Sequence, residues 1–225
     1  LPRGKGSDTL NRIMAEARAI LQESPVNQER MAASKRPANA IWLWGQGKPI
    51  NLPTFREKYG LNGSVISAVD LIKGIGITLG LSPVEVPGAT GYLDTNYQGK
   101  AEHALKALEA RDFVFVHVEA PDEASHSGSL ANKIRAIEDF DRLVVRTVLE
   151  GLKRFPEYRV MVLPDHRTPI VRKTHTAEPV PFAFLSSNDL LKSPRKDAAF
   201  NEVSAQDSGL FVEQGSSLMD LFIKG

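Results

Sequence analysis

The chain has 225 residues, enough for one large domain or two small ones with a substantial apolar core. Its 28 basic and 27 acidic residues give a net charge of +1, so nucleic acid is not expected as a partner. The absence of cysteine excludes disulfides and thiolate catalysis and fits a cytoplasmic protein. No apolar run approaches the roughly 20 residues of a membrane span, so no membrane partner is expected either.

The spacing of apolar residues predicts helices and strands that alternate along the chain. The expected order is helix 8–22, helix 25–31, strand 40–44, strand 64–67, helix 70–79, strand 84–86, helix 100–110, strand 113–118, helix 130–153, strand 158–163, strand 180–185 and helix 217–222. Residues 34–39 are a polar connector with Pro37, which we interpret as a boundary. The alternation predicts an α/β fold with a mostly parallel sheet covered by helices on both faces.

Acidic residues and histidines follow two of the predicted strands. Asp122 and His126 come after one strand, Asp165 and His166 after the next, and His175 follows in a loop. In open α/β sheets, functional groups gather past the carboxyl ends of strands, where distant segments meet. A set of Asp and His without Cys suits Mn, Mg, Zn or Fe at a hydrolytic or transfer centre. The pattern therefore predicts a metal site.

Each of these residues also has a purely structural interpretation. An Asp that follows a strand, such as Asp122, is often the N-cap of a helix. Two further histidines, His103 on a helix of mixed polarity and His117 within a strand, are expected to be ordinary packed or surface residues. The joint occurrence of Asp-x3-His, Asp-His and a third His favours the metal site over independent caps.

A glycine pattern at residues 74–80 suggests a second ligand. Gly74, Gly76 and Gly80 follow Gly-x-Gly-x3-Gly, whereas the dinucleotide fingerprint needs Gly-x-Gly-x2-Gly after a strand. The pattern also lies within a predicted helix. We therefore expect these small residues to allow close helix packing.

Several strings of residues together carry a family resemblance. They are Ala38-Asn-Ala-Ile-Trp-Leu-Trp-Gly-Gln-Gly-Lys48, Gly88-Ala-Thr-Gly-Tyr-Leu-Asp-Thr-Asn96, Val118-Glu-Ala-Pro-Asp-Glu-Ala-Ser-His126, Leu163-Pro-Asp-His166, Thr174-His-Thr176 and Pro179-Val-Pro-Phe182. Over nearly its whole length the chain resembles the archaeal-type cofactor-independent phosphoglycerate mutases, which belong to the alkaline phosphatase superfamily. The resemblance implies an alkaline-phosphatase-like α/β fold. It assigns residues 1–36 to the end of an inserted substrate-capping domain and 37–225 to the C-terminal part of the phosphotransferase core.

The resemblance also implies an activity and its metals. Members of the family interconvert 2-phosphoglycerate and 3-phosphoglycerate through a phosphoserine, without 2,3-bisphosphoglycerate. Two divalent ions (Mn, Mg or Zn) are implied, one held by Asp122, His126 and His175 and the other by Asp165 and His166. The family's nucleophilic Ser and one further Asp have no match in this chain. We therefore expect a portion of a protein of about 400 residues, inactive by itself.

The substrate contacts are less specific. Lys73 resembles a phosphate-binding Lys of the wider family, although a surface lysine at the start of a helix is an equal interpretation. Arg36, Gln46 and Lys48 are candidates for a carboxylate clamp, because Gly45-Gln-Gly-Lys48 stands where other cofactor-independent mutases have an Arg-rich strand end.

Two alternatives to the interpretation as a mutase remain. The same ligands would serve a metal-dependent phosphatase or another phosphotransferase of the superfamily, in which water replaces the second hydroxyl. The chain could also be a non-catalytic metal-binding fragment. In the enzymatic readings the expected partner is a small phosphorylated substrate, phosphoglycerate for a mutase. Assembly into a homo-oligomer is left open.

Overall fold

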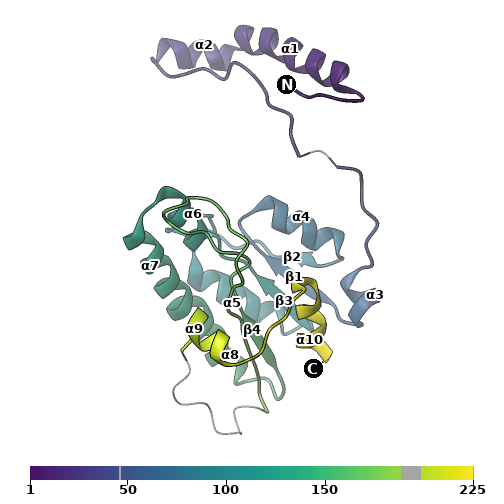
Figure 1. Cartoon of the computed structure of the whole chain (residues 1–225), viewed down its shortest axis with the longest axis vertical. Coiled ribbons are helices and arrows are strands. Elements are labelled where there is room, and N and C mark those ends of the chain that lie inside the picture. The colour runs from purple at the N-terminus through teal and green to yellow at the C-terminus, as the bar shows by residue number, and fades with distance from the viewer. Residues whose placement is uncertain (46, 189–198, 225) are drawn as a thin grey trace. The chain divides into compact units, whose positions relative to one another are not determined.

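The computed structural model describes residues 1–45, 47–188 and 199–224. The chain forms two compact units, Leu1–Asn51 and Leu52–Gly225. The first unit contains α1 (Ser7–Glu23) and α2 (Pro25–Ala32), as the sequence predicts (Figure 1). The division at residue 36 into a capping domain and a core stays a prediction.

A single asparagine organises the first unit. Asn27 is 3% exposed. Its Nδ2 donates to the carbonyls of Leu21 at 2.6 Å and Ala38 at 2.7 Å, and its Oδ1 accepts from the Ala38 amide at 2.9 Å. These bonds hold the chain at Ala38 against the junction of α1 and α2.

The strand predicted over residues 40–44 is wrong. These residues form no ladder with another described segment. The rings of Trp42 and Trp44 stack on each other at 5.8 Å and remain exposed. Apolar alternation predicts which face of a strand is buried, but a strand also needs a neighbour to pair its backbone groups.

The second unit is built on a three-stranded sheet with the order β2-β1-β3. The central strand β1 (Gly63–Ile66) pairs in parallel with β2 (Ser82–Pro83) on one side and β3 (Phe113–Val116) on the other. Every residue of β1 is buried, as its apolar character predicts for a central parallel strand. The expected α/β class with a parallel sheet is confirmed. The strand predicted at 84–86 is displaced, because only residues 82–83 join the sheet.

Helices cover both faces of this sheet. Val65 of β1 packs in an apolar cluster on one face, which is covered by α3 (Phe55–Tyr59), α4 (Asp70–Thr78) and α10 (Leu218–Lys224). The next residue, Ile66, points to the opposite face and packs against Ala104 of α5 (Tyr97–Ala107). This alternation follows from the two-residue period of a strand.

The long helix predicted over residues 130–153 is confirmed, with a change of geometry at its centre. It runs as α7 (Leu130–Asp139), the π-helical segment η1 (Phe140–Val145) and α8 (Arg146–Leu152). Ala136 and Val144 pack against Tyr97 and Ala101 of α5. The η1 and α8 parts of this helix therefore pack along α5.

The last two strands form a separate sheet. β4 (Arg159–Val162) pairs with β5 (Ala183–Ser186), and the pairing is antiparallel because the intervening chain turns back on itself. The sequence predicts both strands but not this direction. Among the described residues of the second unit, the sequence also does not predict α3, α6 (Ala120–Ser127) and α9 (Glu202–Asp207). Within the described ranges, no helix combines the length and apolar character needed to cross a membrane.

Candidate metal centre

Helix α6 places two of the predicted ligands on one face. It begins after β3 with Glu119 as N-cap and ends at Gly128, whose φ of 81° is the left-handed conformation that glycine tolerates. Asp122 and His126 lie one turn apart, and Asp122 Oδ2 is 3.2 Å from His126 Nε2. Asp122 thus lies in the first turn of α6, and its interpretation as an N-cap is wrong.

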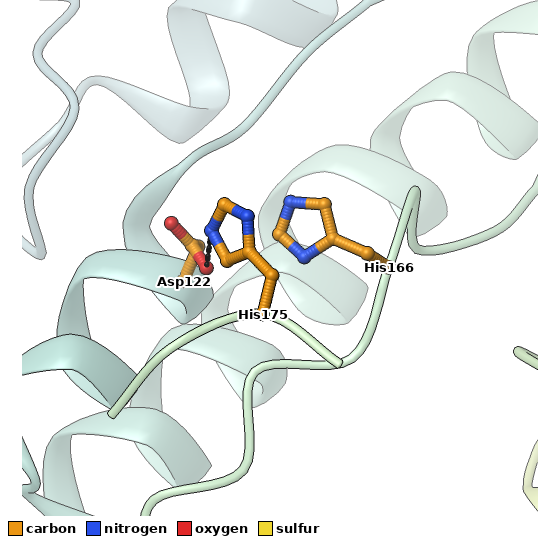
Figure 2. Close-up of side chains that lie close together, drawn as sticks. All are labelled: Asp122, His166 and His175. Carbon is orange, nitrogen blue, oxygen red and sulfur yellow. Dashed lines mark ion pairs between the residues drawn. The ribbon is translucent and has the colours of Figure 1, made fainter. Parts of the chain in front are cut away.

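The loop after β4 folds back on itself and brings two more histidines together. The amide of Thr176 donates to the carbonyl of Arg167 at 3.0 Å in an isolated antiparallel bridge. The Arg167 Nε donates to the carbonyl of Pro179 at 2.8 Å. As a result, the rings of His166 and His175 stack with centroids 3.7 Å apart (Figure 2).

The loop and α6 meet at Asp122. The Nε2 atom of His175 lies 3.4 Å from Asp122 Oδ1 and 3.1 Å from His126 Nε2. One ligand atom from each of Asp122, His166 and His175 falls within 4.8 Å of the others (Figure 2). Four of the predicted ligands, from segments far apart in sequence, therefore converge on one place.

Asp165 lies at the edge of this group. Its Oδ2 is 3.3 Å from His166 Nε2, and its Oδ1 accepts from the His166 amide at 3.0 Å. Its side chain is 69% exposed. In the described part of the chain Asp165 contacts His166 but is not in the cluster around Asp122.

Two groups of the site have shifted pKa values. The Lys173 carbonyl, 2.9 Å from His126 Nδ1, raises the pKa of His126, and Asp122 adds to the effect. Burial raises the pKa of Glu119, which also lies near Glu123 and Asp122. These carboxylates place oxygens within 4.8 Å of one another.

The remaining histidines have structural partners, as expected from the sequence. His117 is half-buried and its Nδ1 is 3.0 Å from Ser67 Oγ. Burial lowers the pKa of His117. His103 contacts the carbonyl of Gly99 in its own helix through Nδ1 at 2.8 Å.

One residue of the site is not among those predicted from the sequence. Thr168 has a buried hydroxyl that donates to Asp122 Oδ1 and lies 3.2 Å from His166 Nδ1. The signal available in the sequence is a hydroxyl residue two positions after the Asp165-His166 pair.

Lys73 lies near the start of α4 and contacts two carboxylates. Its Nζ lies 3.2 Å from Asp70 Oδ1 and 3.5 Å from Glu85 Oε1. The hydrogen bond to Asp70 raises the pKa of Lys73, so it stays charged at neutral pH.

The other substrate candidates lie in the first unit. The side chains of Arg36 and Lys48 are exposed, and the Arg36 carbonyl accepts from Arg30 Nε at 2.9 Å. Gln46 lies outside the described residues. The roles of these residues stay predictions.

The donor atoms at Asp122 fit a divalent metal ion. Two imidazole nitrogens and the oxygens of one carboxylate are separated by 3.1 to 3.4 Å. Ligands bound about 2.0 to 2.2 Å from one tetrahedral ion lie roughly 3.3 Å apart. Nitrogen and oxygen donors without sulfur suit Zn and Mn, and carboxylates also suit Mg.

Comparison with known protein families agrees with this donor set. The family described as the metalloenzyme superfamily matches residues 4–220. The chain belongs to the metalloenzyme superfamily. Membership supports a divalent metal at the site, and it agrees with the alkaline-phosphatase-like fold expected from the sequence.

Curated relatives of this superfamily member confirm the resemblance to cofactor-independent phosphoglycerate mutases. A probable 2,3-bisphosphoglycerate-independent phosphoglycerate mutase of Geobacter sulfurreducens is 48% identical over 99% of the chain and 55% of the relative. A 2,3-bisphosphoglycerate-independent phosphoglycerate mutase of Methanothrix thermoacetophila is 50% identical over 100% of the chain and 57% of the relative. The chain thus spans about half the length of the curated relatives it matches.

Two solved structures are similar in fold to this chain over most of its length. A protein from Pyrococcus horikoshii superposes with a TM-score of 0.78 at 28% identity, over 90% of this chain and 52% of that one. A cofactor-independent phosphoglycerate mutase from Thermoplasma acidophilum has a TM-score of 0.59 at 26% identity, over 96% of this chain and 51% of that one.

Proposed function

We propose that the intact protein interconverts 2-phosphoglycerate and 3-phosphoglycerate in a metal-dependent reaction through a phosphoserine. The observation that carries this proposal is the convergence of Asp122, His126, His166 and His175. Membership of the metalloenzyme superfamily and relatives named as phosphoglycerate mutases support it.

In this proposal the chain supplies ligands for two divalent ions, Mn, Mg or Zn. Asp122, His126 and His175 would hold one ion, while Asp165 and His166 would hold the second. When bound, such ions lower the pKa of a nucleophilic hydroxyl and neutralise charge on phosphoryl oxygens. The contact between His175 and Asp122 and the stacking of His175 on His166 support two adjacent ligand sets.

The chain's own residues orient the donor atoms. His126 donates from Nδ1 to the Lys173 carbonyl, so its Nε2 keeps the lone pair that faces Asp122 and His175. The helix fixes Asp122 and His126 on one face of α6. These constraints reduce the rearrangement that binding requires.

The substrate-binding part of the proposal rests on Lys73 and on the first unit. Lys73 would contact the phosphate by exchanging one of its two carboxylate partners, Asp70 or Glu85. Arg36, Gln46 and Lys48 would contribute to binding the carboxylate of the glycerate. We propose no nucleophile within this chain, and residues 1–36 would belong to a substrate-capping domain.

The test is the fate of the phosphoryl group. We expect the intact protein, supplied with Mn²⁺ and 3-phosphoglycerate, to form 2-phosphoglycerate, which ³¹P NMR resolves from inorganic phosphate. Release of phosphate without the isomer would reject the mutase and support a phosphatase. If neither 2-phosphoglycerate nor inorganic phosphate forms, the result would support the non-catalytic alternative.

A matched pair of variants ties the activity to the site. His175→Ala removes a proposed ligand, whereas His103→Ala removes a histidine that contacts the Gly99 carbonyl in its own helix, α5. We expect His175→Ala to reduce turnover at least about 100-fold and His103→Ala to leave it unchanged. Turnover by the 225-residue chain alone would contradict the placement of the nucleophile outside it.

A further inference from the structure

Thr168 is a buried hydroxyl residue in the loop between Asp165 and His175. Its side chain contacts both parts of the site, because its Oγ1 donates to Asp122 Oδ1 and lies 3.2 Å from His166 Nδ1. Only 5% of the residue is exposed. Water is therefore a poor substitute for either partner.

The number of protons that these groups carry determines which atom donates and which atom accepts each hydrogen bond. An ionised carboxylate only accepts hydrogen bonds, so the single proton of the Thr168 hydroxyl is directed to Asp122. The same oxygen must then accept from His166, which requires the proton of His166 to be on Nδ1. Nε2 of His166 is left with the lone pair, which is the form of imidazole that binds a metal ion.

The backbone at Thr168 is also held in place. Lys133, on α7, donates from Nζ to the Thr168 carbonyl at 2.9 Å. This bond ties the loop to a helix of the second unit. The hydroxyl is therefore presented from a fixed backbone rather than from a free loop.

We propose that Thr168 is a positioning residue of the metal centre, whose one hydroxyl orients the Asp122 carboxylate and sets the tautomer of His166. It thereby links the ligand set on α6 to the ligand set that follows β4. The inference rests on the ligand assignment in the proposed function. Outer partners of metal ligands typically change metal affinity by about 10 to 100-fold when removed.

The test is Co²⁺ binding by the intact protein, followed by the visible absorption of the bound ion. We expect Thr168→Val, which replaces the hydroxyl by a methyl of similar size, to weaken Co²⁺ binding by about 10 to 100-fold. Thr168→Ser keeps the hydroxyl and should bind Co²⁺ within about threefold of the wild type. A matched control is Thr147→Val on α8, whose hydroxyl donates to Gln98 and which should bind like the wild type.

Two results would overturn the positioning role. One is Co²⁺ binding by Thr168→Val equal to that of the wild type. The other is an equal loss in Thr168→Ser and Thr168→Val, which would show that the hydroxyl is not the feature that matters. If Thr168→Val does not fold, Thr168→Ala removes the same hydroxyl and should weaken Co²⁺ binding by about 10 to 100-fold.

His175→Ala separates this inference from the proposed function. If His175→Ala loses Co²⁺ binding while Thr168→Val keeps it, only the role of Thr168 is wrong. If both variants bind like the wild type, the ligand assignment itself is wrong.

Discussion

The Nε2 atoms of His126 and His175 lie 3.1 Å apart although 49 residues separate them in the chain. Both atoms also face the carboxylate of Asp122, at 3.2 Å and 3.4 Å. Two imidazoles and a carboxylate in such close contact are typical of a metal site, because a bound cation compensates the cost of gathering them.

Asp122→Asn keeps the size of the side chain and removes its charge. We expect Mn²⁺ affinity, measured by titration calorimetry, to fall at least about 100-fold, because an amide is a weaker ligand than a carboxylate. Asp141→Asn is the control, because Asp141 is exposed on η1. Equal affinities of the two variants would show that Asp122 is not a ligand.

Removal of the metal should lower the Tm, and this effect should depend on Asp122. A ligand that binds only the folded state adds about 2.7 kcal/mol at a concentration 100 times its Kd. We therefore expect EDTA to lower the Tm of the wild type in Mn²⁺ and to leave the Tm of Asp122→Asn almost unchanged. An equal effect of EDTA on both proteins, in thermal scans read by circular dichroism, would count against the site.

Two glycines of α4 give a paired test of the packing. A Cβ on Gly76 would lie 2.6 Å from Val65 Cγ1, whereas a Cβ on Gly74 would meet no atom of the described residues within 4 Å. We expect Gly76→Ala to lower the free energy of unfolding by about 1 to 3 kcal/mol. Gly74→Ala should be neutral or raise it by up to about 1 kcal/mol. Urea unfolding of both variants checks this, and equal effects would contradict the close contact of α4 with β1.

We expect the shifted pKa of Lys100 to make the free energy of unfolding depend on pH. The residue is fully buried on α5, and its Nζ donates to the His117 carbonyl at 3.2 Å. Burial lowers the pKa of Lys100 from 10.5 to about 8, and Glu119 opposes part of this shift. Between these two values the unfolded chain keeps a proton that the folded chain releases, so stability rises with pH in this window.

The comparison with Lys100→Met isolates this contribution. Below pH 8 both states of Lys100 are protonated, and the folded state carries the full cost of the buried charge. From pH 8 to pH 10 we expect the wild type to gain about 2 kcal/mol relative to Lys100→Met. Urea unfolding at several pH values measures the difference. A constant difference across this range would show that Lys100 titrates normally.

Local patterns were sufficient to predict much of the second unit. The apolar run of β1 and the helical spacing of residues 130–152 predict elements that the structure contains. The glycine pattern predicts close packing, which Gly76 shows, whereas Gly74 has no such contact among the described residues. These features depend on a few neighbouring residues.

The missed features depend on contacts between distant segments. The strand predicted at residues 40–44 has no pairing partner among the described residues. The antiparallel direction of β4 and β5 follows from the path of the intervening loop. Helix α6 is short and polar, so no apolar period indicates it. The hydrogen bonds of Thr168 likewise require Asp122 and His166 to be close in space.

The central claim is that Asp122, His126 and His175 bind one divalent ion. The most direct measurement is an anomalous difference map from a crystal of the intact protein grown with Mn²⁺. We predict a peak bonded to an Asp122 oxygen and to the Nε2 atoms of His126 and His175. A fully loaded crystal whose Mn²⁺ peaks all lie away from these three side chains would contradict the account.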